Sequence, residues 1–268
     1  MRDLGIVNPH ARLVARLLGG YAGLIYLFLF APVAMLILLA FNSSRTVGLP
    51  IRSLTLHWFT MIPSDGLIQD ALFTSLVVGF WVTLLATTIG TAAAFPLVRA
   101  RIRHRSAVRV LITLPIMIPG LLIGVSLLIL FRNVLSVQPS ETTAIVGQVV
   151  VSTPFVILVV SSRLEGFDGN LERAAADLGA IAVQRLRLIV LPLIAPGIAA
   201  AALIAFTLSI DEFIVTNFLI GAGQTLPIYI YNQIKFGITP EVNALATLML
   251  AGTLLVVAGV AGLLAVLR

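Results

Sequence analysis

The sequence predicts an all-α integral membrane protein with six transmembrane helices and both termini in the cytoplasm. Hydrophobic residues make up 59% of the 268 residues and charged residues only 10%, whereas soluble domains average about 45–50% and about 25%. The mean hydropathy is +1.10. A water-soluble fold of this length cannot bury so large an apolar fraction, so the composition requires a lipid environment.

Six apolar segments are each near or above the about 20 residues that a helix needs to cross a bilayer. They cover residues 20–41, 71–98, 107–131, 143–161, 188–209 and 242–267. Pro115, Pro119, Pro154 and Pro196 lie inside or near the ends of these segments, where neighbouring helices can satisfy the backbone groups that proline leaves free. We expect a single transmembrane domain over residues 1–268, whose first apolar run is too long for the core of a cleaved signal peptide.

Lys and Arg are unequally distributed among the connections. There are three in the N-terminal tail, five in the connection 99–109, four in the connection 162–187 and one at the C-terminus. The other three connections together carry four. Because loops rich in Lys and Arg stay in the cytoplasm, both termini and the 162–187 connection are predicted to be inside. These positions also argue against nucleic-acid binding, despite the net charge of +6. The run from Arg99 to Arg105 is interpreted either as an anchor to anionic headgroups or as a contact with a cytoplasmic partner.

A polar stretch, residues 171–192, lies between two apolar runs, and its first part has helical periodicity. Apolar residues recur there at i, i+3, i+4 and i+7, on one face of a helix, as Leu171, Ala174, Ala175 and Leu178. Asp168 and Asn170 are candidate N-caps, and Gly179 suits the left-handed residue that follows a helix. So short a helix is unstable alone in water, so we expect it to rest on another surface.

The spacing in this stretch resembles the E-A-A-x3-G-x9-I-x-L-P motif (the EAA motif), which marks the cytoplasmic coupling loop of permease subunits in bacterial ABC importers. The matching residues are Ala174, Ala175, Gly179, Ile189, Leu191 and Pro192. Arg173 occupies the leading Glu position, and Glu172 precedes it, so the source of the polar contact usually given by the motif Glu stays open. The alternative, a short interfacial helix that merely links two spans, leaves this spacing unexplained.

The resemblance implies a type I ABC importer permease fold and a coupling helix that docks on an ATPase dimer, which binds ATP and Mg. The residues expected to couple to the ATPase are Leu171, Glu172, Arg173, Ala174, Ala175, Asp177, Leu178 and Gly179, and those expected to transmit movement into the fifth span are Ile189, Leu191 and Pro192. The chain itself lacks a phosphate-binding loop, because its only lysine, Lys235, stands between Ile and Phe. We expect no cofactor, metal or catalytic residue in this chain, which has no cysteine and three scattered histidines.

Asp211 and Glu212 form a charged pair beside apolar sequence. Counting about 1.5 Å per residue from Leu188 places Asp211 roughly 35 Å along, near the outer end of the fifth span. Two interpretations stay open: charges of an outer loop, or carboxylates that line a substrate pathway, since acidic residues in a bilayer usually face protein or water. Thr216 and Asn217 would add neutral hydrogen-bonding groups to such a pathway.

The sequence around these residues, and nearly the whole chain, resembles the permease of spermidine/putrescine importers; the similarity is strongest over 162–250. That family implies a bacterial inner-membrane location, a second homologous permease and an extracytoplasmic binding protein, and carboxylates suit a polycationic substrate. The segment 226–237 is predicted to form a short helix, which in this family lies on the outer face and helps to meet the binding protein.

Three alternatives remain. The same permease class imports other small solutes, such as an amino-acid derivative, an opine or ferric iron. An autonomous secondary transporter needs ion-coupling carboxylates inside the bilayer, and the first four segments and the sixth lack central charges. A membrane scaffold without transport leaves the coupling-loop spacing unexplained.

Overall fold

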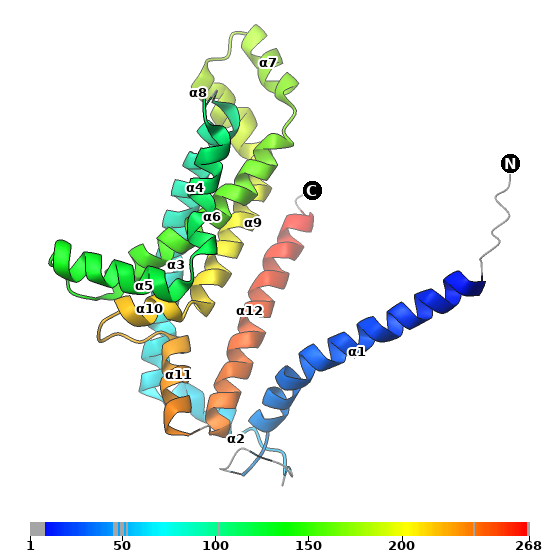
Figure 1. Cartoon of the computed structure of the whole chain (residues 1–268), viewed down its shortest axis with the longest axis vertical. Helices are drawn as coiled ribbons and strands as arrows, with labels where there is room; N and C mark the ends of the chain where they lie inside the picture. Colours follow the sequence, from blue (N-terminus) through cyan, green and yellow to red (C-terminus); the bar gives the residue numbers. More distant parts are fainter. Residues whose placement is uncertain are drawn as a thin grey trace. The chain divides into compact units, whose positions relative to one another are not determined.

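The structure is a computed structural model that describes residues 9–44, 48, 51, 53–100, 102–237 and 239–266. In these ranges the regular secondary structure is helical apart from one isolated antiparallel bridge, between Asn42 and Leu54. The all-α prediction is therefore confirmed (Figure 1). The chain divides into two compact units: residues 1–62 with 233–249, and residues 63–232 with 250–268.

The helices, in chain order, are α1 (Pro9–Ala40), α2 (His57–Met61), α3 (Gly66–Arg99), α4 (Arg105–Met117), α5 (Gly120–Ile129), α6 (Glu141–Glu165), α7 (Gly169–Asp177), α8 (Ala182–Arg185), α9 (Leu191–Asp211), α10 (Ile214–Leu219), α11 (Leu226–Phe236) and α12 (Pro240–Val266). A 3-10 turn covers Ile62–Ser64, and π-helical turns cover Leu130–Val134 and Leu186–Val190. Among the described residues, five helices are long and apolar enough to cross a membrane, or six if the bent pair α4 and α5 counts as one span. The multi-pass architecture agrees with the sequence, and α11 confirms the short helix expected over 226–237.

The third predicted span, over 107–131, is not one continuous helix. α4 ends at Met117, α5 begins at Gly120, and the two helices are bent by 95°. Ile118 is extended, with ψ 130°, because the ring of Pro119 disfavours the helical conformation of the residue before it. Pro119 therefore breaks this span.

The fifth span begins earlier than the sequence indicated. It starts at Ala182 rather than Leu188 and runs through α8, a π-helical turn and α9 to Asp211. The N–H of Leu191 bonds the carbonyl oxygen of Leu186, five residues back, which is the π-helical pattern. The arginines at 185 and 187 are typical of a loop, yet here they lie on a continuous helix.

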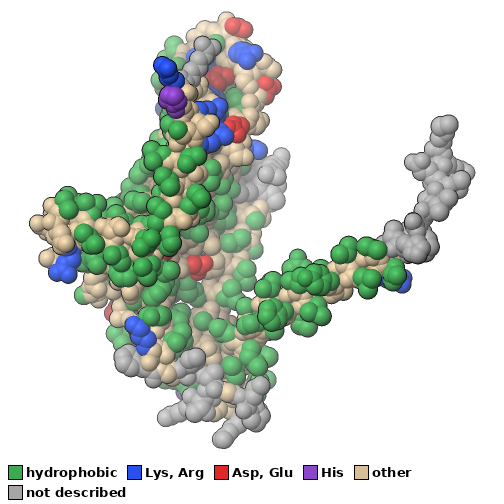
Figure 2. Space-filling model, viewed as in Figure 1, with side chains coloured by type: hydrophobic (Ala, Val, Ile, Leu, Met, Phe, Trp, Pro, Cys, Tyr) green, Lys and Arg blue, Asp and Glu red, His purple; other side chains and the backbone are tan. Residues whose placement is uncertain are grey.

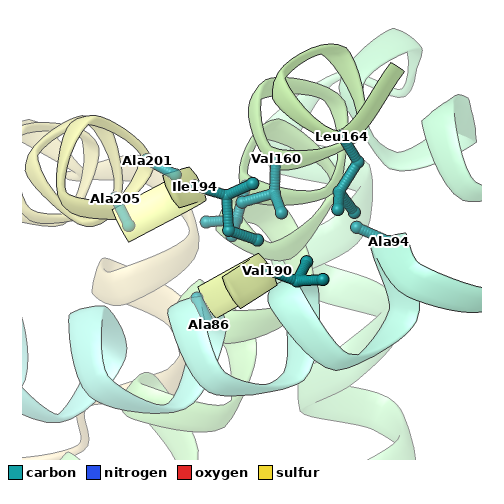
Figure 3. Close-up of a cluster of buried hydrophobic side chains, with 9 residues drawn as sticks. Ala86, Ala94, Val160, Leu164, Val190, Ile194, Ala201 and Ala205 are labelled. Atoms are coloured by element: carbon teal, nitrogen blue, oxygen red, sulfur yellow. The ribbon is translucent and has the colours of Figure 1, made fainter. Parts of the chain in front are cut away.

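The core of the second unit is formed by α3, α6 and α9, whose facing surfaces are lined with small residues. Figure 3 shows this cluster, which includes Ala86 and Ala94 of α3, Val160 of α6 and Ala201 of α9. A Cβ at Gly90 of α3 would lie 2.6 Å from a methyl group of Val156, so the backbones approach closely only because Gly90 has no side chain. Small residues allow such close packing between membrane helices.

Candidate functional site

α7, the helix of the polar stretch, has well-formed signals at both ends. A carboxylate oxygen of Asp168 accepts a hydrogen bond from the N–H of Asn170 at 2.9 Å and so caps the N-terminus. At the other end, the N–H of Gly179 bonds the Ala176 carbonyl oxygen (2.9 Å) and the N–H of Ala180 bonds the Ala175 carbonyl oxygen (3.0 Å). These two bonds form a Schellman motif, for which Gly179 has φ +86°. The predicted helix and its glycine stop are confirmed.

One face of α7 leaves apolar side chains uncovered. Leu178 is 89% exposed and Leu171 49% exposed, and Ala174 between them is also exposed. Ala175, beside this face, and Glu172, about a quarter turn from Leu171, are half-buried against the rest of the chain. These side chains give an otherwise polar helix one apolar face.

The half-buried face of α7 is fastened to the end of α3 by an ion pair. Nη1 of Arg99 lies 2.8 Å from one carboxylate oxygen of Glu172 and 3.0 Å from the other. The Arg99 guanidinium also lies 5.7 Å from the ring centroid of Phe95 and 5.5 Å from that of Phe167, within the range of cation–π attraction. We call these four residues the Arg99 clamp.

The clamp clarifies the departure from the motif. The acidic residue is Glu172, one position before the motif Glu, and it forms an ion pair with Arg99. Arg173, which occupies the motif position, is exposed and among the described residues donates only a long hydrogen bond (3.4 Å) to Asn170. The sequence did not reveal Arg99 as the partner of Glu172, because 73 residues separate the two. The only local signal was the basic run that begins at Arg99.

Further ion pairs lie at the same end of the second unit. Arg105 and Arg109 of α4 both contact the carboxylate of Glu165, the last residue of α6. Figure 2 shows the basic side chains gathered around the ends of α4 and α6 and around α7 and α8. This end therefore carries most of the positive charge of the unit, as the unequal distribution of Lys and Arg indicated.

The residues after α7 lead into the helical core. Of the three predicted transmission residues, Ile189 and Leu191 are half-buried and Pro192 is exposed. Val190 between them is fully buried and joins the cluster formed by α3, α6 and α9. Val190 was missed from the sequence, because nothing in an apolar run distinguishes the residue that faces the core.

The charged pair lies at a break between helices at the other end of α9. α9 ends at Asp211, which is exposed, and Glu212 is extended (ψ 111°) before α10 begins. A carboxylate oxygen of Glu212 accepts a hydrogen bond from the N–H of Val215 at 2.8 Å, in the first turn of α10. One of the two carboxylates thus stabilises the break while the other stays accessible. Asn217 is exposed as well.

Thr216 is fully buried and takes part in a polar network. The side-chain nitrogen of Gln148 on α6 donates to the Thr216 hydroxyl at 2.6 Å, and the Ser209 hydroxyl of α9 contacts the oxygen of the same amide. Thr216 therefore joins three helices and presents no free group to a pathway in this structure. Gln148, a polar residue within an apolar span, was the signal that sequence reasoning passed over.

The fold and these two sites are those of a multi-span membrane protein in which helix α7 leaves an apolar face uncovered. Residues 86–268 match the family model described as the binding-protein-dependent transport system inner membrane component. The spermidine/putrescine transport system permease protein PotC of Escherichia coli (strain K12) is 37% identical over 247 residues, which cover 91% of this chain and 93% of that protein. The putrescine transport system permease protein PotI of the same strain is 36% identical over 257 residues, or 93% of this chain and 89% of that protein.

Solved structures agree on the fold. A bacterial ABC transporter involved in the import of the acidic polysaccharide alginate superimposes with a TM-score of 0.75 at 18% identity, over 95% of this chain and 96% of that chain. The inward-facing MetNI methionine ABC transporter gives a TM-score of 0.68 at 20% identity, over 77% of this chain and 98% of that chain.

The chain belongs to the family of binding-protein-dependent transport system inner membrane components. It is a multi-pass transport subunit of the inner membrane, not an enzyme, and subunits of this kind work with an ATPase and a binding protein.

Proposed function

We propose that this chain is the permease subunit of an ATP-driven importer of polyamines such as spermidine and putrescine. The observation that carries the proposal is the combination of relatives named for these substrates, aligned over about nine-tenths of the chain, with an accessible carboxylate at the break after α9. Both termini and α7 face the cytoplasm, in keeping with the excess of Lys and Arg in the connections on that side.

The exposed face of α7 docks in a groove of an ATPase dimer. Leu171 and Leu178 supply the apolar contact, and the small side chain of Ala174 between them allows close approach. Nucleotide-driven closure moves α7, and the movement reaches α3 through the Arg99 clamp and α9 through Val190. The Arg99 clamp thus provides a route from α7 to α3, in addition to the route into the fifth span that the motif suggests.

At the other end of α9, Asp211 attracts the cationic substrate. Its carboxylate is exposed at the break, and opposite charges attract strongly where water is partly excluded. Glu212 keeps the break open by its hydrogen bond to α10, so its negative charge is held beside Asp211. A second, homologous permease completes the pathway, and an extracytoplasmic binding protein delivers the substrate.

Uptake of radiolabelled spermidine by the reconstituted transporter tests the substrate. Asp211→Asn is expected to raise the half-saturating concentration severalfold while assembly with the partner subunits stays unchanged. Glu141→Gln is the matched control, because Glu141 is an exposed acidic residue at the N-terminus of α6. Equal half-saturating concentrations in the two variants would refute the role of Asp211. Transport of an anion or a neutral sugar instead of spermidine would refute the polyamine assignment.

Association with the ATPase tests the docking face. Leu178→Asp places a charge at the centre of the apolar contact and is expected to abolish co-purification of the ATPase. Leu135→Asp adds the same charge at an exposed leucine that follows α5 and is expected to leave association intact. Normal association of the Leu178 variant would exclude α7 as the docking helix.

A further inference from the structure

A basic hollow lies between α7 and the helical core, on the side of α7 opposite its exposed leucines. Its volume is about 350 Å³. Its lining combines three guanidinium groups, one carboxylate and two apolar side chains, from Arg99, Arg173, Arg185, Glu172, Leu164 and Phe167. We call it the arginine hollow.

The charges in this hollow are not balanced. Glu172 neutralises one of the three arginines, its ion-pair partner Arg99. Within the described part of the chain, Arg173 has only the long bond to the neutral amide of Asn170, and the Nε of Arg185 is buried without a hydrogen-bond partner. A buried charged donor without a partner is costly, because it has given up water and gained nothing in return. The unpaired donors of this hollow therefore suit an anion with several acceptor oxygens.

The position of the hollow indicates where that anion comes from. Arg99 is the last residue of the span formed by α3, and Arg185 lies in the first turn of the span that begins at Ala182. Both helices are longer than the about 30 Å hydrocarbon core, and the second, at about 45 Å, matches the thickness of a bilayer that includes its headgroups. The two arginines at their ends therefore reach the layer where the phosphates of lipid headgroups lie. The ring of Phe167 beside them suits the apolar part of an amphiphile.

The partner ATPase is the competing source of an anion, through one of its carboxylates. The geometry disfavours it, because the hollow is lined by Gly169, Glu172 and Arg173 of α7. These residues lie about half a turn round the helix from Leu171 and Ala174 of the face proposed for docking.

We propose that the arginine hollow binds the phosphate of an anionic phospholipid from the cytoplasmic leaflet. Arginine forms paired hydrogen bonds with phosphate oxygens, so Arg173 and Arg185 hold the headgroup while Arg99 keeps its bond to Glu172. The lipid thereby holds α7 to the ends of α3 and α8. The inference rests on the cytoplasmic position of α7 proposed above, but lipid binding is measured without transport, so the two can fail separately.

Native mass spectrometry of the full chain, purified in detergent, tests the proposal with added phosphatidylglycerol or phosphatidylcholine. Wild-type protein is expected to retain phosphatidylglycerol selectively, and Arg185→Gln is expected to weaken that binding about tenfold. Arg187→Gln is the matched control. It removes the same charge only two residues along the chain, and the Arg187 side chain is exposed and does not line the hollow. Circular dichroism of each variant verifies that its helices are intact.

Three results would overturn the proposal. Equal binding by the Arg185 and Arg187 variants would show that the hollow is not the site. Displacement of the lipid by glycerol phosphate at equal concentration would identify free phosphate as the ligand. Loss of the bound lipid when the ATPase is added would assign the hollow to a carboxylate of that partner. Retention of phosphatidylglycerol in the complex with the ATPase is the expected outcome.

Discussion

Breaking the Arg99 clamp is expected to loosen α7 without unfolding the helical core. The side chains of Arg99 and Glu172 are 32% and 25% exposed, so their ion pair is screened by water more than a buried pair but less than a free surface pair. Exposed pairs contribute about 0.2–1 kcal/mol. We therefore expect a coupling energy near the upper end, about 1 kcal/mol, which corresponds to about a fivefold change in the equilibrium for local opening.

A double-mutant cycle isolates this coupling. Glu172→Gln removes only the ion pair, whereas Arg99→Gln also removes attraction to the rings of Phe95 and Phe167, each about 0.5–1 kcal/mol at an exposed site. The arginine variant is thus expected to be the more severe. Exchanging the two residues restores the ion pair but not the ring contacts, so protection is expected to recover only in part.

Hydrogen exchange of the backbone amides in residues 169–180 measures the opening directly. Arg105→Gln is the control, because it removes a charge at the same end of the unit but from a residue paired with Glu165 instead. Strict additivity of the Arg99 and Glu172 variants would refute the reasoning, because it would mean that the contact contributes no coupling energy.

Three further substitutions test the geometry. Gly179→Ala is expected to cost about 1–2 kcal/mol, because an L-residue is strained at φ +86°, and to speed exchange in the last turn of α7; unchanged exchange would contradict the Schellman stop. Gly90→Val is expected to cost about 1–3 kcal/mol by overpacking and to lower the thermal unfolding midpoint in detergent, whereas Gly252→Val meets nothing within 4 Å and should leave it unchanged. Gln148→Leu leaves the Thr216 hydroxyl unpaired and is expected to lower the free energy of unfolding by about 1–3 kcal/mol. Adding Thr216→Val is expected to recover part of the loss in the unfolding midpoint. No recovery would show that this hydrogen bond does not stabilise the protein.

Local signals were the part of the structure that could be predicted. The N-cap at Asp168 and the stop at Gly179 depend on bonds within four or five residues, so the spacing of residue types was sufficient to place α7. The predicted beginning of the fifth span was wrong because it, too, relied on local residue types. Arg185 and Arg187 are typical of a loop, and only the packing of Val190 in the core shows why the helix continues through them.

The break at Pro119 shows the limit of a local rule. Membrane helices tolerate proline, as Pro154 inside α6 and Pro196 inside α9 demonstrate, so a proline in an apolar run does not by itself predict a 95° bend. The conformation after the bend depends on tertiary contact: Gly124 of α5 lies so close to Phe218 that an added Cβ would come within 2.9 Å of its ring. Contacts of this kind join segments about 90 residues apart and leave no pattern in the sequence.

The two ends of α9 are connected by one helical element, which constrains how α7 can influence the carboxylate pair. The span from Ala182 to Asp211 has 30 residues, or about 45 Å at the rise of an α-helix. Helices bend mainly at prolines and π-helical turns. The features of these kinds in this span, the turn Leu186–Val190, Pro192 and Pro196, all lie in its first half. The remainder, whose Ala201 and Ala205 are fully buried in the core cluster, has no such feature. A displacement of α7 is therefore either absorbed by bending in the first half of the span or transmitted as movement of the rest of the helix. The next place where the backbone can bend is the break at Glu212.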